Sequence, residues 1–349
     1  MKVSIVIPAY NAERTLGEVI TGCLNQDYPA LCRGRIYPTR GFDESNPYNK
    51  EKIEIIVVDD GSTDNTGKVA KEYPVKYIRQ EKGGPAKARN TGFRLARGEI
   101  ICFIDSDCIP PQDWLSRLTE NFTGEEVGGC GGSYDIINKE SLVASCIQQD
   151  ILYRHDRIPR ECLFLGSYNV AFRKKVLEET EGFNEEYMIA SGEDNDLSYK
   201  IIKKGYKLIF DKENKVGHRH PATLRKFLKQ QFWRAFWRMK LYRSHPDMVK
   251  GDNYSNLADY IQPPLFLFLV ILLPFVKIHP ARIWLFILTI SGLVLQLPAA
   301  ISAIKRTKGN RHLAIIPLNF LRGFVWAGGM SAGTFTFFSK VFLRYGRKR

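Results

Sequence analysis

The sequence predicts an α/β domain with a mostly parallel sheet, followed by C-terminal membrane helices. Three observations support this prediction. Short β-branched runs alternate with helical periods in the first third of the chain, two nearly uncharged stretches lie in the last quarter, and positive charge flanks those stretches. Strands that alternate with helices imply a sheet covered on both faces, and such sheets bind ligands beyond the carboxyl ends of the strands.

Four apolar runs in the first third are expected to be buried strands separated by helices. The expected strands are residues 3–7, 53–58, 75–78 and 100–104, and the expected helices are residues 12–25, 63–73 and 86–96. The first run is too short for a secretory signal and ends at Pro8. We therefore expect a domain that starts at residue 1 and stays cytoplasmic.

One segment, residues 30–52, interrupts this alternation. It contains Gly, Pro, Asn, Tyr and mixed charge without a clear period. Loops of this length are uncommon in compact domains and are either functional or mobile. The sequence leaves both interpretations open.

The apolar stretches of the last quarter are expected to enter a membrane. Residues 283–304 are long enough to cross a bilayer, and residues 261–276 are at the short limit. A third apolar region, residues 313–343, is interrupted by Arg322 and several glycines. The alternative is a buried helical hairpin in a soluble protein.

The charge balance is strongly basic. Lys and Arg number 51, Asp and Glu number 37, and the formal net charge is +14. Such a balance suggests anionic partners: nucleic acid, phosphate-rich small molecules or anionic lipid. Basic clusters at residues 223–243, 305–311 and 344–349 flank the apolar stretches, so the positive-inside rule puts all three on the cytoplasmic side. Two to four crossings remain open, depending on whether residues 313–343 cross once, return or lie in the interface.

Residues 223–245 predict an amphipathic helix in an anionic membrane surface, because apolar side chains recur at helical spacing and cationic ones lie mainly elsewhere. Basic residues with interleaved aromatics also suit nucleic acid. The adjacent apolar stretches favour the membrane, so we expect membrane lipids and no nucleic acid as partners. The residues expected at the interface are Gln231, Trp233, Arg234 and Trp237.

These patterns divide the chain into three expected parts. They are a cytoplasmic domain over residues 1–222, an interfacial helix over residues 223–245, and a membrane region of two to four helical segments over residues 261–343. The seven cysteines form no Cys-x-x-Cys pair and no Cys/His cluster at zinc spacing. We expect them to be reduced and mostly buried, as in a cytosolic domain.

Acidic residues follow two of the expected strands. Asp59 and Asp60 come after the second strand, and Asp105 and Asp107 after the fourth. Side chains at i and i+2 point to the same face, so the second pair is able to aim both carboxylates toward one pocket. Hard oxygen ligands of this kind suit Mg²⁺ or Mn²⁺, which neutralises a diphosphate. Loop solvation and helix capping are the alternative.

A third acidic cluster, residues 192–197, opens an expected helix over residues 197–203. Carboxylates at a helix start cap the helix in many proteins. The functional alternative is that Asp194 is a general base, since a carboxylate within hydrogen-bond reach takes the proton of a poorly nucleophilic hydroxyl.

Together these motifs resemble glycosyltransferase family 2, which has the GT-A fold. The resemblance covers residues 1 to about 240, and its motifs occur in family order. Each motif alone is weak, but the ordered set is specific. The matching runs are residues 5–11, 25–29, 56–64, 84–92, 105–107, 166–173, 182–185 and 192–197.

The resemblance implies roles for individual residues. Asp105 and Asp107 resemble the pair that binds the metal and the nucleoside diphosphate, Asp107 more directly. Asp194 resembles the catalytic base, with Glu193 beside it. The other implied donor contacts are Pro8, Tyr10, Asp60, Lys87 and Arg89, and the implied acceptor side is Gly166, Ser167 and Asn169. The implied mechanism is a single displacement with inversion, in which the base deprotonates an acceptor hydroxyl as the nucleoside diphosphate leaves.

Two further features bear on the resemblance. His218 stands where many family members have a His that joins the metal or diphosphate, although a His pair with one residue between is more often structural. Residues 231–235 resemble the Gln-x-x-Arg-Trp motif of processive members, but Ala235 replaces the Trp. This departure and the small membrane region speak against a processive polymer synthase.

Three functions follow as hypotheses. The first is an inverting, metal-dependent hexosyltransferase that moves a sugar from a nucleotide-sugar to a hydroxyl of a lipid-linked or surface glycan. The second is a polyprenyl-phosphate sugar synthase resembling dolichyl-phosphate mannose or glucose synthases, whose anionic acceptor needs no base. The third is a non-catalytic scaffold of a glycan-assembly complex. UDP is the commoner nucleotide of the family and GDP also occurs; donor sugar, acceptor and oligomeric state stay open.

Overall fold

The computed structural model describes residues 1–28 and 53–345, with the side chains of Lys250 and residues 340–345 left out. The segment 30–52 and the last residues of the basic tail therefore lie outside the described residues. The chain forms two compact units. The first contains Met1–Asp135 and Pro159–His218, and the second contains Ile136–Ile158 and Arg219–Arg349.

The first unit is built on one mixed sheet in the order β3-β2-β1-β4-β8-β6-β9-β5, with β7 paired to β9. The first four of these strands are parallel, and β8 and the strands beyond it extend the sheet by antiparallel pairing. The strands are β1 (Val3–Ala9), β2 (Ile53–Asp59), β3 (Lys76–Arg79), β4 (Ile100–Ile104), β5 (Cys108–Ile109), β6 (Val127–Ile136), β7 (Glu161–Cys162), β8 (Asn169–Arg173) and β9 (Lys207–His218).

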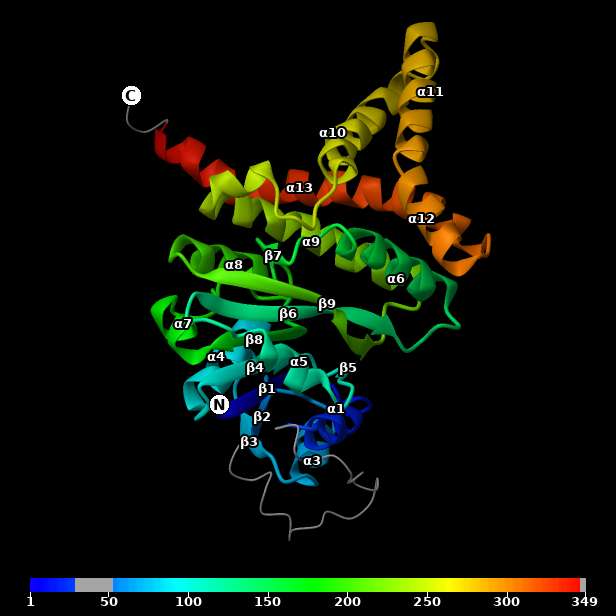
Figure 1. Ribbon diagram of the computed structural model, residues 1–349. Helices are drawn as coiled ribbons and strands as arrows, with labels where there is room; N and C mark the ends of the chain where they lie inside the picture. Colours follow the sequence, from blue (N-terminus) through cyan, green and yellow to red (C-terminus); the bar gives the residue numbers. More distant parts are fainter. Residues whose placement is uncertain (29–52, 346–349) are drawn as a thin grey trace. The chain divides into compact units, whose positions relative to one another are not determined.

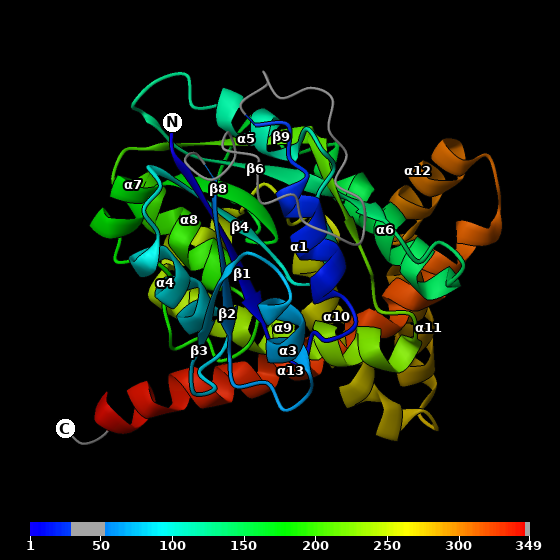
Figure 2. The same ribbon diagram turned by 90° about the horizontal axis from the view of Figure 1, so that it is seen from below.

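Helices cover both faces of the parallel strands, as the β-branched runs predict. Val3, Ile5 and Ile7 of β1 pack in one core with α1, whereas Val6 on the opposite face meets Gly92 of α4. Figure 2 shows α1 and α4 on opposite sides of these strands. The helices of this unit are α1 (Leu16–Leu24), α3 (Thr66–Lys71), α4 (Pro85–Leu95), α5 (Trp114–Glu120), α7 (Lys174–Glu179) and α8 (Glu193–Lys203).

The sequence-based strands are confirmed to within one or two residues. The fourth agrees at both ends, and the first continues through Pro8 to Ala9. Two of the three expected helices begin later than their apolar periods suggest, since α1 starts at Leu16 rather than at residue 12 and α3 starts at Thr66 rather than at residue 63. The third, α4, starts at Pro85, one residue before the expected residue 86. The six described cysteines are free and buried, as expected. The parallel strands and their acidic carboxyl ends thus form the scaffold that the sequence predicts.

The second unit is helical within the described residues. Its elements are α6 (Leu142–His155), α9 (Leu224–Ser244), η2 (Pro246–Lys250), α10 (Leu257–Leu272), η3 (Leu273–Phe275), α11 (His279–Val294), α12 (Leu297–Thr307), η4 (Arg311–Ala314) and α13 (Ile315–Tyr345). The expected amphipathic helix is α9. The stretch expected over residues 283–304 is divided between α11, which ends at Val294, and α12, which begins after Gln296 and has Pro298 in its first turn.

Three segments of this unit are long and apolar enough to cross a membrane. They are Leu257–Phe275, His279–Thr307 and Arg311–Ser339, with mean hydropathies of 1.7, 2.0 and 1.3. In Figure 1, α10 and α11 form a hairpin, and α13 runs alongside α9. Length and composition therefore support the expected C-terminal membrane helices.

Candidate active site

The carboxyl end of β2 presents a buried carboxylate bound by backbone amides. Asp60 follows β2 and is 5% exposed. Its Oδ1 accepts hydrogen bonds from Gln80 Nε2 at 2.7 Å and from Gly83 N at 2.8 Å, and its Oδ2 accepts one from Gly84 N at 2.8 Å. These bonds fix the loop before α4 against the end of β2, so the loop that begins α4 is held over the carboxyl edge of the sheet.

A buried arginine joins two of the acidic motifs. Arg89 of α4 is 2% exposed, and its Nη2 lies 2.7 Å from Asp105 Oδ1 while its Nη1 lies 3.0 Å from Glu193 Oε1. Burial alone would lower the pKa of Arg89, but the charges of Asp105 and Glu193 outweigh it and raise that pKa. Arg89 Nε has no hydrogen-bond partner among the described residues. The guanidinium therefore holds the end of β4 and the start of α8 together.

The start of α8 presents two carboxylates in different surroundings. Gly192 precedes the helix with φ of 104°, a left-handed conformation that favours glycine. Glu193 is 2% exposed and accepts a hydrogen bond from Ser191 N at 2.7 Å, whereas Asp194 is half-buried. Burial and the neighbouring charge of Asp194 raise the pKa of Glu193 to about 7, although Arg89 opposes this. Only Asp194 of the two is open to a ligand.

A possible metal site lies beyond β4. Asp107, Cys108 and His218 bring one ligand atom each within 4.8 Å of one another. Asp107 Oδ2 lies 3.6 Å from His218 Nε2, because β5 pairs with the end of β9 and sets Cys108 opposite His218. Partial burial raises the pKa of the Asp107 carboxyl; His218 opposes this and Asp105 adds to it. A bound cation would relieve the cost of holding these carboxylates together.

The donor set fits a hard or borderline divalent ion. A carboxylate and an imidazole both bind Mn²⁺, and carboxylates suit Mg²⁺. Burial and the neighbouring carboxylates of Asp107 and Asp105 raise the pKa of the Cys108 thiol well above its usual range. A cysteine sulfur is also a soft ligand, whereas Mg²⁺ and Mn²⁺ prefer oxygen donors. Asp107 and His218, with Asp105 nearby, are therefore the residues that would hold the ion.

The remaining expected donor contacts surround this edge of the sheet. Pro8 is buried within β1, and Tyr10 just beyond it is 43% exposed. Lys82 Nζ donates to Tyr10 Oη at 2.8 Å and lies 4.0 Å from the ring centroid. Lys87 is half-buried on α4. The Tyr10 ring is thus partly exposed and is oriented by Lys82.

The expected acceptor residues are mainly buried. The Asn169 side chain is fully buried; its Oδ1 accepts from Trp114 Nε1 at 2.7 Å, and its Nδ2 donates to the carbonyls of Ser133 and Asn214. Ser167 is 5% exposed, and Gly166 precedes it beside the Tyr168 ring. Asn169 therefore joins β8 to its neighbours through every polar atom of its amide, and a substrate contact would have to come from the surrounding backbone.

Two aromatic residues lie near the candidate metal site: Tyr168, which belongs to the matching run 166–173, and Tyr134, which was not predicted. Tyr134 stacks on Tyr168 with ring centroids 3.5 Å apart and lies 4.7 Å from the His218 ring. A tyrosine near the end of a glycine-rich strand was the available signal, since β6 reads Val-Gly-Gly-Cys-Gly-Gly-Ser-Tyr-Asp-Ile. These rings position the His218 imidazole beside Asp107.

The residues expected at the membrane surface lie on α9 in the second unit. Gln231 is 5% exposed and accepts a hydrogen bond from Trp326 Nε1 at 3.0 Å. Trp237 contacts Phe337 with ring centroids 5.7 Å apart, whereas Trp233 is 38% exposed and Arg234 is exposed. Residues of the apolar face of α9 therefore pack against α13, and the side chains of Trp233 and Arg234 are exposed.

Comparison with known proteins identifies the class. Residues 4–181 match Glycosyl transferase family 2, and residues 100–303 match Glycosyl transferase family group 2. The chain belongs to glycosyltransferase family 2 and is a glycosyltransferase, which confirms the resemblance drawn from its motifs.

Individual relatives agree with this assignment. Glycosyltransferase AglE of Haloferax volcanii is 28% identical over 239 residues, which is 66% of this chain and 70% of that protein. A Methanococcus voltae enzyme, named dolichyl N-acetyl-α-D-glucosaminyl phosphate 3-β-D-2,3-diacetamido-2,3-dideoxy-β-D-glucuronosyltransferase, is 25% identical over 249 residues, 65% of this chain and 70% of that protein. Other curated relatives are longer, and the chain spans 56% and 32% of two of them.

The fold has a solved counterpart. Mannosyltransferase PcManGT from Pyrobaculum calidifontis, solved in complex with GDP-Man and Mn²⁺, superimposes with a TM-score of 0.53 at 19% identity, covering 95% of this chain and 86% of that protein. The likeness supports the GT-A fold that the motifs imply. The divalent metal of that neighbour is the Mn²⁺ of its complex.

Proposed function

We propose that this glycosyltransferase moves a sugar from a nucleotide-sugar to a hydroxyl of a lipid-linked or surface glycan, with inversion and with the help of a divalent metal. One observation supports the proposal above others. Arg89 links Asp105 after β4 to Glu193 at the start of α8, which brings the diphosphate-binding motif and the half-buried Asp194 to the same edge of the sheet.

The donor would bind at the carboxyl ends of β1, β2 and β4. Tyr10, Asp60 and Pro8 border the expected nucleoside region, and Lys87 and Arg89 supply positive charge on α4. Asp107 and His218, with Asp105, would hold Mg²⁺ or Mn²⁺, whose charge stabilises the departing nucleoside diphosphate. UDP-sugars are the first donors to test and GDP-sugars the second.

Asp194 is proposed as the base. In a single displacement the acceptor oxygen bonds to the anomeric carbon, the bond from that carbon to the diphosphate breaks, and Asp194 takes the hydroxyl proton. Glu193 is buried against Arg89 and is proposed as a positioning residue that fixes Arg89 and the start of α8. This division of roles rests on the difference in exposure between the two neighbouring carboxylates.

The named Methanococcus relative favours a lipid-linked acceptor, since its name describes transfer onto a dolichyl-linked glucosaminyl phosphate. The alternative is transfer to polyprenyl phosphate itself. A phosphate oxygen is already anionic, so that reaction would not need Asp194.

The test is nucleoside diphosphate release and sugar transfer by membrane-extracted protein, with a panel of UDP- and GDP-sugars and membrane acceptors. We expect one donor to be used, and its use to be lost in Asp107→Ala and in Asp194→Asn. Asp113→Asn is the matched control, because the Asp113 side chain is 46% exposed and forms an ion pair with Arg117 in the next turn. It should keep wild-type activity.

Each outcome separates the alternatives. If activity were lost in Asp107→Ala but kept in Asp194→Asn, the acceptor would be a polyprenyl phosphate and not a hydroxyl. No release with any donor, from folded protein with acceptors supplied, would overturn the proposed reaction.

We also propose the expected division of the chain, with residues 1–222 as the catalytic part on the cytoplasmic side, residues 223–245 as an interfacial helix and residues 261–343 as the membrane region. The three long apolar segments of the second unit and the basic clusters beside them support this. Membrane lipids are then partners of the second unit. Fractionation and carbonate extraction test this, since a protein released by carbonate would not be integral.

A further inference from the structure

The three candidate membrane segments differ in what surrounds them. The hairpin of α10 and α11 exposes large apolar side chains along its length, among them Phe268, Trp284 and Phe286, which are 59%, 57% and 68% exposed. In an apolar window of 18 residues, 39% of the Arg311–Ser339 segment is buried, against 28% for Leu257–Phe275 and 22% for His279–Thr307. The hairpin is therefore suited to lipid on its outer faces, whereas much of α13 is covered by protein.

The helix that covers α13 is α9, and the two run side by side in the same direction. Gln231 pairs with Trp326, the Phe236 and Phe337 ring centroids lie 5.1 Å apart, and the Arg243 guanidinium donates to the Phe337 carbonyl. The partners advance together along both helices. Figure 1 shows α13 alongside α9.

Small residues of α13 make this contact close. A Cβ at Gly329 would lie 2.5 Å from Phe232 O, and one at Gly333 would lie 2.4 Å from Phe236 O. Gly328, one residue earlier, would meet its nearest neighbour, a ring carbon of Phe232, at 3.8 Å. The α9–α13 contact is thus a fitted helix interface in which two glycines admit the α9 backbone.

The sequence of α9 determines where this pair lies in a bilayer. The helix has no acidic residue and seven cationic ones: Arg225, Lys226, Lys229, Arg234, Arg238, Lys240 and Arg243. Each Lys or Arg is costly near the centre of a bilayer. If α13 crossed the membrane with α9 packed against it, Arg243 would be placed in the hydrocarbon layer, because it bonds Phe337. Phe337 lies about 16 Å along α13 from Trp326, at ~1.5 Å per residue. That distance is roughly half the thickness of a ~30 Å hydrocarbon layer.

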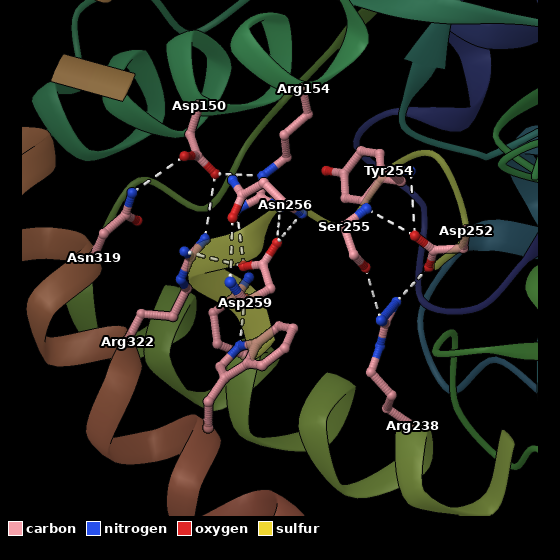
Figure 3. Close-up of polar contacts among 12 residues, drawn as sticks. Asp150, Arg154, Arg238, Asp252, Tyr254, Ser255, Asn256, Asp259, Asn319 and Arg322 are labelled. Carbon is pink, nitrogen blue, oxygen red and sulfur yellow. Dashed lines mark hydrogen bonds and ion pairs between the residues drawn. The ribbon is translucent and has the colours of Figure 1, made fainter. Parts of the chain in front are cut away.

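The start of α13 is also held by charged groups, as Figure 3 shows. Arg322 of α13 lies 3.2 Å from Asp150 of α6 and 3.4 Å from Asp259 at the start of α10, and Arg154 pairs with both acids. Asn319 adds a bond to Asp150 at 3.1 Å. These polar contacts connect the N-terminal part of α13 to α6 and to the start of α10, and not to the apolar part of the α10–α11 hairpin.

We propose that α13 does not cross the membrane but lies in its interface beside α9, so that the chain enters through α10, returns through α11, and keeps both termini on one side. The α9–α13 pair is then the surface that binds the membrane. The exposed cationic side chains of Lys229 and Arg234 suit contact with anionic headgroups. The exposed rings of Trp233 and Phe335 suit the boundary between headgroups and acyl chains.

The test is cysteine cross-linking in native membranes. Phe236→Cys with Phe337→Cys should cross-link, read as a linked peptide pair by mass spectrometry. Phe236→Cys with Phe335→Cys is the matched control, because Phe335 is on the same helix but 76% exposed. We expect at least a tenfold higher yield for the first pair, in membranes that retain the protein after carbonate extraction.

A second measurement needs no substitution within the helices. Epitope tags on the two ends of the unaltered chain, probed in sealed vesicles, should be accessible from the same side. Tags on opposite sides, or a Phe236–Phe337 yield no higher than the control, would overturn the proposal. Neither readout depends on transferase activity, so failure of the proposed reaction would leave the result unaffected.

Discussion

Each unit holds a cluster of charged side chains, and the two clusters differ in charge balance and in exposure. In the first unit, Arg89 pairs with Asp105 and Glu193, and Asp194 and Asp107 lie nearby. Carboxylates therefore outnumber the cations in this cluster, which we call the open cluster. In the second unit, which is helical, the charges of two acids and two arginines balance each other, and we call this set the closed cluster. Those four side chains, Asp150, Arg154, Asp259 and Arg322, are at most 14% exposed.

The difference separates binding from support. Asp105 and Asp107 are 31% and 45% exposed, and an unbalanced, partly open set of carboxylates is stabilised when a cation or a cationic complex arrives. A balanced, closed set gains nothing from a ligand and loses much if one member is removed. We therefore expect substitutions in the first cluster to act on catalysis and those in the second on stability.

The largest effect is expected at the open cluster. Asp107→Asn keeps the shape but removes the charge that would hold the ion, and metal ions contribute several kcal/mol to such reactions. We expect kcat/KM to fall by about 10³-fold or more, which is ~4 kcal/mol. Chelation of wild-type protein should abolish activity, and Mn²⁺ or Mg²⁺ should restore it.

The thermal unfolding midpoint is the control for that variant. It should be unchanged or higher in Asp107→Asn, because burial raises the pKa of this carboxyl and its charged form is therefore disfavoured in the fold. A variant with lower stability and intact activity would reverse the roles assigned to the two clusters.

The closed cluster should respond in the opposite manner. Arg154→Met leaves Asp150 and Asp259 with Arg322 as their remaining partner, and breaking such a buried pair costs about 3–5 kcal/mol. We expect a large loss of stability in detergent, with kcat/KM of the surviving folded fraction nearly unchanged.

Charge balance rather than the arginine itself should decide that loss. Arg154→Met combined with Asp150→Asn removes one charge of each sign, so it should recover part of the stability. Equal stability of the single and double variants would show that the arginine acts through packing alone.

The sequence predicted the parallel strands of the sheet in the first unit better than its antiparallel strands. Strands such as Ile100–Ile104 are continuous β-branched and apolar runs, and their pattern is local. β6 is rich in glycine, and its pairing with β8 joins residues far apart in the chain. The placement of α6 in the second unit likewise depends on ion pairs with distant residues, for example Asp150 with Arg322.

The candidate site follows the same rule. Asp60, Asp105, Asp107 and Asp194 stand at element ends, so motifs and periodicity were enough to select them. That Glu193 is buried against Arg89, 104 residues away, has no sequence signal. The amphipathic pattern of α9 predicted a surface helix but could not reveal that α13 would cover its apolar face, because amphipathic patterns specify a face and not its partner.

The coupling of Glu193 to its neighbours predicts a pH effect of intermediate size. Its pKa of about 7 is raised, so the carboxylate is lost as the pH falls below 7, and Arg89 then keeps its strong partner Asp105 only. We expect kcat/KM to rise with pH up to about 7 in wild type. In Glu193→Gln, which does not titrate, this acid limb should move at least one pH unit lower, with kcat at pH 8 reduced about tenfold or less.

If the acid limb were unchanged in Glu193→Gln, titration of Glu193 would not be the cause of the pH response. Glu178→Gln is the matched control, since the Glu178 side chain is 59% exposed, pairs with Lys174 on the surface of α7, and should leave the profile as it is.

The smallest effect is expected where the same kind of ion pair is open to water. Arg306 Nη2 lies 2.6 Å from Asp156 Oδ2, which is shorter than the 2.9 Å between Arg154 and Asp150 in the closed cluster, but the two side chains are 30% and 58% exposed. Water solvates either partner when the other is removed, so Arg306→Gln should change stability by only ~0–1 kcal/mol. Thermal unfolding of Arg306→Gln beside Arg154→Met compares two arginine pairs of one unit that differ in burial. If both losses were equal, distance alone would govern these pairs, and the distinction between a closed supporting cluster and open charges would fail.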